Sequence, residues 1–376
     1  MKQSTVRFSK QKDKDFNSTL RERVNAYFAE KGKSMKADSN AVLKSVVMLA
    51  MYFLPFAALF IFQISNPWIF LLMWTVMGLG AAGIGVNIMH DANHGAYSKN
   101  DKVNKYMGLW MNVIGGNAAT WKLQHNVLHH SFTNIDGHDH DIAGPPMLRF
   151  SPHQELKPMH RFQHIYAWFL YGLMTLFRSL VTDFTNAWRF RKFGLMRNDK
   201  DFRKLLWDIF FWKAFYFTYI IVLPVIFLPV APWLVILGFF IMHFVLGLTL
   251  ALIFQCAHVM PECEFPTPDD NGKMDNNWAV HQLMTTANFS PKSRIFSWFV
   301  GGLNFQVEHH LFQHVCHTHY RELSQIVQST AKEFGIQYNM QKNFVLAIWN
   351  HGKMLKQLGA VPAPVEQEHP AFKKNK

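Results

Sequence analysis

HNVLHH, residues 125–130, is the stretch that decides the fold of this chain. Two further histidine clusters are HDANH at residues 90–94 and QVEHH at residues 306–310. Each of the three clusters lies beside a hydrophobic run, and together they supply seven histidines. A single histidine in apolar surroundings is usually a satisfied core residue. Seven in three spaced clusters instead indicate a metal site, because imidazole binds Fe, Zn, Cu and Ni.

The spacing inside the clusters indicates two ions rather than one. Histidines four residues apart lie on the same face of a helix, so the first and last histidines of HDANH can direct two imidazoles at one ion. The first two histidines of HNVLHH can do the same. The adjacent histidine that ends the second and third clusters points elsewhere and can reach a second ion. The predicted ligands are His90, His94, His125, His129, His130, His309 and His310.

The composition indicates a membrane protein with a basic surface. Of the 376 residues, 49% are hydrophobic and 15% aromatic, and the formal net charge is +13. A basic excess indicates an anionic partner, either nucleic acid or anionic lipid. The long apolar runs decide for membrane lipid, and no nucleic-acid-binding motif is present. The three cysteines form no CxxC pair, and the polar, charged N-terminus does not resemble a cleavable signal peptide.

Four charge-poor runs predict an all-α integral membrane protein. Ser45–Ile64 and Trp68–Met89 are each long enough to cross a hydrocarbon core of about 30 Å, and a short polar break between them predicts a hairpin. Ile209–Val230 and Trp233–Ala257 predict a second hairpin. Two hairpins with short outer loops place all three histidine clusters at the same, cytosolic ends of four transmembrane helices. The glycines within residues 78–85 favour close helix packing, although they would equally leave room for an apolar chain.

Two further apolar segments are predicted to lie along the membrane surface. Tyr106–Ala119 is too short to span and is interrupted by Gly115-Gly116, which indicates an interfacial or re-entrant segment. His164–Leu180 could span, but residues 182–205 carry seven Lys or Arg. A single crossing would place this basic loop opposite the basic N-terminus, against the positive-inside rule. We therefore predict that His164–Leu180 is interfacial.

The ends of the chain are predicted to be cytosolic. Residues 1–40 form an N-terminal segment that is cytosolic or interfacial, residues 41–320 form the central domain, and residues 321–376 form a helical segment and tail. Apolar residues recur every four positions in the N-terminal segment and predict an amphipathic helix, lying either on the membrane surface or on the protein itself. These residues are Phe16, Leu20, Val24 and Phe28.

The three clusters, on this pattern of hairpins, resemble the membrane fatty acid desaturase family. The glutamine that opens QVEHH resembles the front-end desaturases, which place a double bond between an existing one and the carboxyl end. The flanking segments are most similar to bacterial linoleoyl-CoA (Δ6-type) desaturases. These segments are RERVNAYF at 21–28, FTNIDGHDHDI at 132–142 and WAVHQLMTTANF at 278–289.

The resemblance implies four transmembrane helices under a cytosolic helical cap that holds a di-iron centre. The seven cluster histidines fall on ligand positions of the family, and no catalytic side chain is expected beyond the ligands. Gln306 falls where many relatives carry a ligand histidine, so it binds iron directly, through water, or not at all. The family also draws a histidine from the end of its fourth helix, which favours His258 over the competing His281. Asp91 and Glu308 are expected either to orient imidazoles as hydrogen-bond acceptors or to pair with basic residues of the cap.

The resemblance also implies an activity: insertion of a cis double bond into an acyl chain, with O₂ as co-substrate and electrons from outside. Removing hydrogen from an unactivated methylene requires an oxidant that no side chain supplies, whereas iron with O₂ supplies one. The expected substrate is an unsaturated acyl-CoA or acyl-lipid. Many front-end relatives carry a fused cytochrome b5 domain, for which the residues before the first span are too few. We therefore expect a separate electron donor of the ferredoxin or cytochrome b5 type.

Two other functions fit the same residues less well. A membrane fatty acyl hydroxylase shares the histidine clusters and differs only in whether oxygen is added or a second hydrogen leaves. A membrane metal-binding protein or transporter would place its polar residues at the bilayer midplane, where His243 is the clearest example. The predicted location is the bacterial inner membrane with the site on the cytosolic side. The remaining clustered histidines are expected to be structural or solvated; they are His138, His140, His314, His317 and His319.

Overall fold

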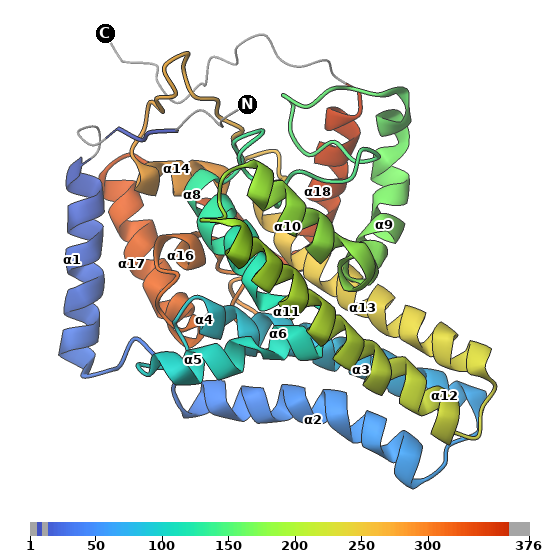
Figure 1. Ribbon diagram of the computed structural model, residues 1–376. Coiled ribbons are helices and arrows are strands. Elements are labelled where there is room, and N and C mark those ends of the chain that lie inside the picture. Colours follow the sequence, from blue (N-terminus) through green and yellow to red (C-terminus); the bar gives the residue numbers. More distant parts are fainter. Residues whose placement is uncertain (1–5, 10–13, 361–376) are drawn as a thin grey trace, which may run out of the picture.

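The computed structural model describes residues 6–9 and 14–360, which form a mainly helical molecule (Figure 1). The all-α class predicted from the sequence is confirmed. Five helical segments of the described part are long and apolar enough to cross a membrane. The parts of the predicted end segments that fall on the other residues lie outside the described residues.

Two helical hairpins correspond to the four predicted spans. The first pairs α2 (Ser39–Ile61) with α3 (Pro67–Ile84), and the second ends in α13 (Pro232–His258). In Figure 1 the turns of both hairpins lie at the same end of the molecule, far from the histidine clusters. The first arm of the second hairpin consists of α11 (Asp199–Phe217), the π-helical turn η5 (Thr218–Val222) and α12 (Leu223–Phe227).

Glycines let α3 pack closely against both of its neighbours. A Cβ added to Gly80 would lie 2.7 Å from the backbone nitrogen of Tyr52 in α2. A Cβ added to Gly78 would lie 2.7 Å from the backbone oxygen of Met242 in α13. Any larger residue would therefore push the helices apart. Of the two interpretations of these glycines, the structure supports close helix packing.

The fifth apolar segment, Pro158–Lys192, is bent rather than straight. Its first arm is α9 (Gln163–Phe177), which runs away from the cap end in Figure 1, and α10 (Asp183–Lys192) returns toward that end. The bend coincides with a π-helical turn, η4 (Arg178–Thr182), which is a recognised cause of helix kinks. That His164–Leu180 is interfacial stays a prediction.

Six further helices and two strands lie over the ends of the hairpins and form what we call the cap. Besides helices, the cap contains a parallel pair of strands, β1 (Ala287–Phe289) and β2 (Asn339–Gln341), with Asn288 opposite Met340. The helices of the cap are α1 (Lys14–Lys31), α14 (Trp278–Thr285), α15 (Arg294–Phe299), α16 (Gln306–Leu311), α17 (Tyr320–Glu333) and α18 (Phe344–Leu358).

Helix α1 lies on the cap and does not present its apolar face to a membrane. All four apolar residues that define this face are buried. They pack in one cluster with residues of α16 and α17 such as Val307, Leu323 and Val327. Arg23 also forms an ion pair with Glu333 at 2.7 Å. The membrane-surface interpretation of this helix is therefore wrong, because amphipathicity identifies an apolar face but not the surface that covers it.

The segment between the first hairpin and the second cluster consists of three short helices. They are α5 (Asp101–Gly108), α6 (Trp110–Val113) and α7 (Ala118–Lys122). None is long enough to span a membrane, as predicted. The turn between α6 and α7 requires glycine, because Gly115 has φ of +93° and its missing Cβ would lie 2.8 Å from the Tyr216 ring.

The arrangement of the hairpins leads to a labelling prediction. Cysteines introduced at the exposed positions Asn100 and Asn198 should react from one side of the membrane, and a cysteine at exposed Asn66 should react from the other. The reason is that Asn66 lies in the α2–α3 turn, whereas the other two begin α5 and α11 at the opposite helix ends. A membrane-impermeant thiol reagent measures this. Labelling of Asn198→Cys from the Asn66 side would mean that α9 and α10 make a crossing. Lys373, a further candidate for labelling on the first side, lies outside the described residues.

Candidate metal centre

The three histidine clusters are delivered by helices that depart from regular α geometry. Helix α3 continues through the π-helical η1 (Gly85–Met89) into α4 (His90–Asn93), which begins with the first cluster. The second cluster occupies another π-helical segment, η2 (Leu123–His129), and runs into α8 (His130–Phe132). The third cluster lies on α16. π-Helical turns inside α-helices are frequent at functional sites because they redirect side chains.

The histidines converge on two neighbouring groups, and the ligand nitrogens within each group lie within 4.8 Å of one another. The two groups are adjacent, because His130 lies within the same distance of both His309 and His310. The first histidine group is His90, His94, His125 and His309. The second histidine group is His129, His258 and His310.

The inner nitrogens of these rings are buried without partners. Among the described residues, no hydrogen bond reaches Nε2 of His94, His129, His258, His309 or His310. A buried nitrogen without a partner is costly, and five that face one another would be very costly in an empty core. The residues therefore fit a pair of bound metal ions, for which these nitrogens would be ligands.

The outer nitrogens of the same rings are held by oxygen acceptors. A histidine that donates Nδ1–H to an oxygen keeps the lone pair of Nε2 free for a metal and cannot rotate. Six rings have such a partner. They are His125 with Asp141 Oδ2 at 2.9 Å, His129 with Asp139 Oδ2 at 2.9 Å, His310 with Gln282 Oε1 at 2.7 Å, His94 with Gln313 Oε1 at 3.1 Å, His309 with Tyr320 Oη at 3.2 Å and His258 with Thr285 O at 3.3 Å.

Burial keeps most of these imidazoles neutral, as metal ligands must be. Burial and the neighbouring histidines hold the pKa of His130, His309 and His310 well below its usual value. His129 differs: burial lowers its pKa, but the adjacent Asp139 carboxylate more than offsets this and raises it. A ring with this partner is also a stronger donor to a metal.

The sequence pattern of the family described as fatty acid desaturase matches residues 66–342.

The chain belongs to the fatty acid desaturase family.

Curated relatives extend the similarity over almost the whole chain. The sn-1 linoleoyl-lipid 6-desaturase of Arthrospira platensis is 34% identical over 92% of this chain and 93% of its own length. The enzyme of the same name from Synechocystis sp. is 35% identical over 92% of this chain and 95% of its own length. The acyl-lipid (8-3)-desaturase of Physcomitrium patens is 35% identical over 95% of this chain and 74% of its own length. The predicted family is confirmed, and the protein is an oxidoreductase that desaturates fatty acyl chains.

The two candidates for the additional ligand differ in where the desaturase places them. His258 ends α13 in the second histidine group, and its ring centroid lies 4.7 Å from that of His129. His281 lies on α14, and its Nε2 is 2.8 Å from the backbone oxygen of Thr133. His258 is therefore available to a metal, whereas His281 fixes the backbone that follows the second cluster.

The two carboxylates expected beside the ligands bind other groups. Asp91 Oδ2 accepts a hydrogen bond from His317 Nδ1 at 2.7 Å, and His317 Nε2 is 3.0 Å from Lys44 Nζ. Asp91 Oδ1 lies 3.8 Å from His90 Nδ1, so the main partner of this carboxylate is His317, a histidine for which we expected no specific role. Glu308 accepts from Asn288 and Tyr338 rather than from an imidazole of the clusters. Burial raises the pKa of Glu308 to about 7.

The acceptors that orient the rings were not identified from the sequence. Asp139 and Asp141 lie in the segment FTNIDGHDHDI, and Gln282 in WAVHQLMTTANF; both segments were noted only for their similarity to relatives. The signal that could have found the two aspartates is their alternation just beyond HNVLHH, where the chain must turn back. For Gln313 and Tyr320 no local signal exists.

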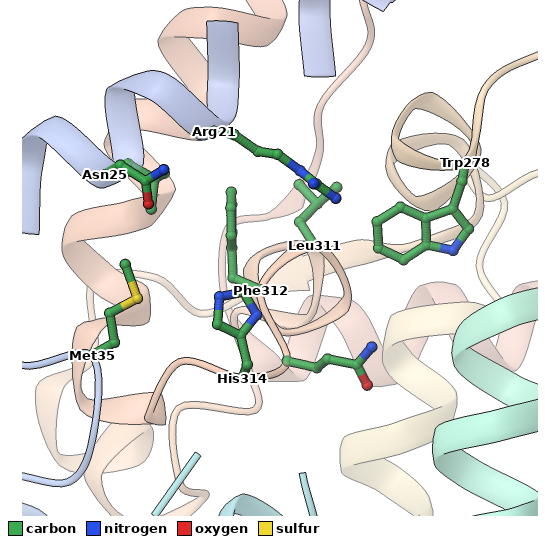
Figure 2. A pocket seen from close by; sticks show the side chains of 9 residues that line it. Arg21, Asn25, Met35, Trp278, Leu311, Phe312 and His314 are labelled. Atoms are coloured by element: carbon green, nitrogen blue, oxygen red, sulfur yellow. The ribbon is translucent and has the colours of Figure 1, made fainter. Parts of the chain in front are cut away.

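A pocket of about 290 Å³ opens beside the centre, between α1 and the end of the third cluster (Figure 2). Arg21 reaches into it from α1. Its wall includes Gln313, which holds His94, and Trp278, whose Nε1–H donates to His130 O at 3.0 Å. The side chain of Gln313 therefore separates the pocket from His94 of the first histidine group. Its lining is Arg21, Val24, Asn25, Met35, Trp278, Leu311, Phe312, Gln313 and His314.

Gln306 begins α16 and is buried, one turn before His309 and His310. A ligand role of the Gln306 amide oxygen predicts that Gln306→Ala lowers desaturation by about 10- to 100-fold. Gln306→Glu should lower it less, since it keeps that oxygen. Gln306→His should retain the iron content, because imidazole is a competent iron ligand. Product formation and iron analysis of the purified variants measure these effects. Unchanged turnover and iron in Gln306→Ala would reduce the centre to histidines alone.

Proposed function

We propose that the protein is a front-end acyl desaturase with a di-iron centre, which inserts a cis double bond into an unsaturated acyl chain of a lipid. The observation that carries this proposal is the pair of adjacent histidine groups whose inner nitrogens have no partner among the described residues. The relatives are named as acyl-lipid desaturases, which favours an acyl-lipid over an acyl-CoA. Attack at the sixth carbon fits the two 6-desaturases best.

The two histidine groups would each hold one iron. His130 lies between them and could bind either ion, and Gln306 is placed to approach from α16. Two irons with O₂ supply the oxidant that an unactivated methylene requires. The reaction removes two hydrogens from the chain and reduces O₂ to two waters, with two electrons and two protons from outside. A ferredoxin or a cytochrome b5 type protein would supply the electrons.

The residues around the two histidine groups orient the imidazoles and exclude water from the site. Asp139 and Asp141 fix the rings of His129 and His125 through their Nδ1 atoms. The Trp121 ring stacks on His125 at a centroid distance of 4.5 Å and limits its rotation. The ring centroid of Phe254 lies 4.9 Å from that of His129, so Phe254 covers the second histidine group on the α13 side. Side chains that cannot move preorganise a site and keep water from a strong oxidant.

We further propose four membrane crossings, by the two hairpins, with the cap and the centre on the cytosolic side of a bacterial inner membrane. The bent course of α9 and α10 and the basic loop that follows them support this topology, because both then stay with the other basic segments. The net charge of +13 suits the anionic cytoplasmic surface of such a membrane.

Expression in a host without polyunsaturated fatty acids, supplied with defined precursors, tests the proposed function. Chromatography and mass spectrometry of the lipids should show a new cis double bond on the carboxyl side of an existing one. A hydroxylated product would assign the protein to the hydroxylases. Bound iron in the purified protein together with loss of product in a His94→Ala variant would exclude a background activity of the host. Absence of any new fatty acid with every precursor, in a protein that holds iron, would contradict the proposal.

A further inference from the structure

Helix α18 presents an apolar stripe to the outside of the cap. Val345 is 77% exposed and Trp349, one turn later on the same face, is 64% exposed. The opposite face of α18 is buried and contains His351, Met354 and Leu355. Large apolar residues on a helix that already has a buried face need a second covering surface.

The inner face of α18 is anchored firmly, so the exposure of the stripe is not a sign of a loose helix. The His351 Nε2 lies 2.7 Å from Tyr171 Oη of α9, and its Nδ1 lies 2.8 Å from the backbone oxygen of Val259. Val259 directly follows His258 of the second histidine group. Gly352 faces the Trp168 ring of α9, and an added Cβ would make an ordinary van der Waals contact with this ring at 3.5 Å. The position of α18 is thus tied to the metal centre.

The apolar stripe continues onto the neighbouring helices. On one side α9 exposes Ile165 and Phe169, and α9 belongs to a segment apolar enough for a membrane. In Figure 1 α18 and α9 lie side by side. On the other side α15 contacts the start of α18 through Phe296 and Phe344, with ring centroids 4.7 Å apart, and exposes Ile295. The three helices therefore form one band along the edge of the cap.

The charged residues of α18 itself are all basic. Helix α18 contains no Asp or Glu, and Lys353 Nζ lies 5.8 Å from the centroid of the Trp349 ring. Lys342 and Arg294 are exposed at the starts of α18 and α15. Tryptophan with lysine just beyond it is typical of a helix at a membrane surface, where the ring sits at headgroup level and the ammonium reaches the phosphates.

We propose that the band of α15, α18 and α9 lies in the surface of the lipid bilayer, on the headgroups of anionic phospholipids. The sequence led us to expect that the C-terminal part of the cap lies in the cytosol. In this proposal α18 instead lies in the bilayer surface and fixes the depth of the metal centre through His351 and Val259. This proposal rests on the membrane location of the protein and does not depend on its oxidative chemistry.

Spin labels on the full-length protein in liposomes of phosphatidylglycerol and phosphatidylethanolamine test the proposal. The three cysteines of the chain are buried, so labels attach to introduced ones. Labels at Val345→Cys and Trp349→Cys should collide several-fold more with O₂, relative to a water-soluble nickel chelate, than a label at the exposed control Gln328→Cys of α17. Equal ratios at all three positions would overturn the proposal.

Two further outcomes would also overturn it. Low access of both reagents to position 349 would mean that another part of the protein covers the band, and spin–spin broadening at low protein density would mean that a second copy does. A measurement without labels is quenching by lipids brominated in the acyl chain. The emission lost in Trp349→Phe should be quenched in the native protein, and unquenched Trp349 emission would place the ring in water.

Discussion

Replacing His129 by alanine is expected to abolish desaturation and to release iron from the purified protein. His129 is completely buried in the second histidine group, and its Nε2 has no partner among the described residues. Loss of a hydrogen-bond partner of a ligand typically costs 10- to 100-fold in metal affinity or activity, so loss of the ligand itself should cost more than about 100-fold. Iron analysis and product formation in membranes measure the two effects.

His281→Ala is the matched control for this variant. His281 is equally buried and lies in the same part of the molecule, but its Nε2 is bound to the backbone of Thr133. Its removal leaves a small cavity and one unpaired carbonyl, which should lower stability without releasing iron. Full activity and iron in His129→Ala would remove this residue from the centre. Tightly bound zinc as the activating metal would contradict the oxidative mechanism itself.

The spacing of the histidines and the apolar runs were sufficient to predict the positions of the clusters and the hairpins. Both signals are local: a charge-free run long enough to span a membrane, and two histidines on one helical face. The basic residues within 182–205 favour an interfacial course of His164–Leu180, which stays a prediction. By length and composition alone, this segment is a fifth candidate span.

The surroundings of the clusters could not be predicted, because they depend on contacts between distant parts of the chain. The carboxylate of Asp91 lies closer to His317 than to the ring of the adjacent His90, and the contact with His317 joins two segments that only the folded chain brings together. The apolar face of α1 was evident in the sequence, yet whether lipid or protein covers it depends on where α17 lies. Sequence patterns identify which atoms need a partner, and the fold selects that partner.

The orientation of His129 depends on one carboxylate, and Asp139→Asn is expected to lower desaturation and iron affinity by about 10- to 100-fold. Asp139 is buried and uses both oxygens: Oδ2 accepts from His129 Nδ1 and from the backbone nitrogen of Asn134, and Oδ1 accepts from the backbone nitrogen of Asp141, each at 2.9 Å. An asparagine has the same shape, but its amide nitrogen cannot accept a hydrogen bond. The variant must therefore lose either the hydrogen bonds to Oδ2, from His129 and Asn134, or the one to Oδ1, from Asp141.

Asp136→Asn is the control for the loss of a charge in the same turn. Asp136 is only partly buried, and none of the described hydrogen bonds links its carboxylate to a ring of the two histidine groups. This variant should retain iron and activity. Iron titration separates an effect on the metal from a general loss of stability, which thermal unfolding of the same samples would detect. If Asp139→Asn kept the iron affinity and turnover of the native protein, the orientation of His129 would have to come from packing against Phe254 and His258 alone. The carboxylate would then serve only to hold the backbone turn after the second cluster.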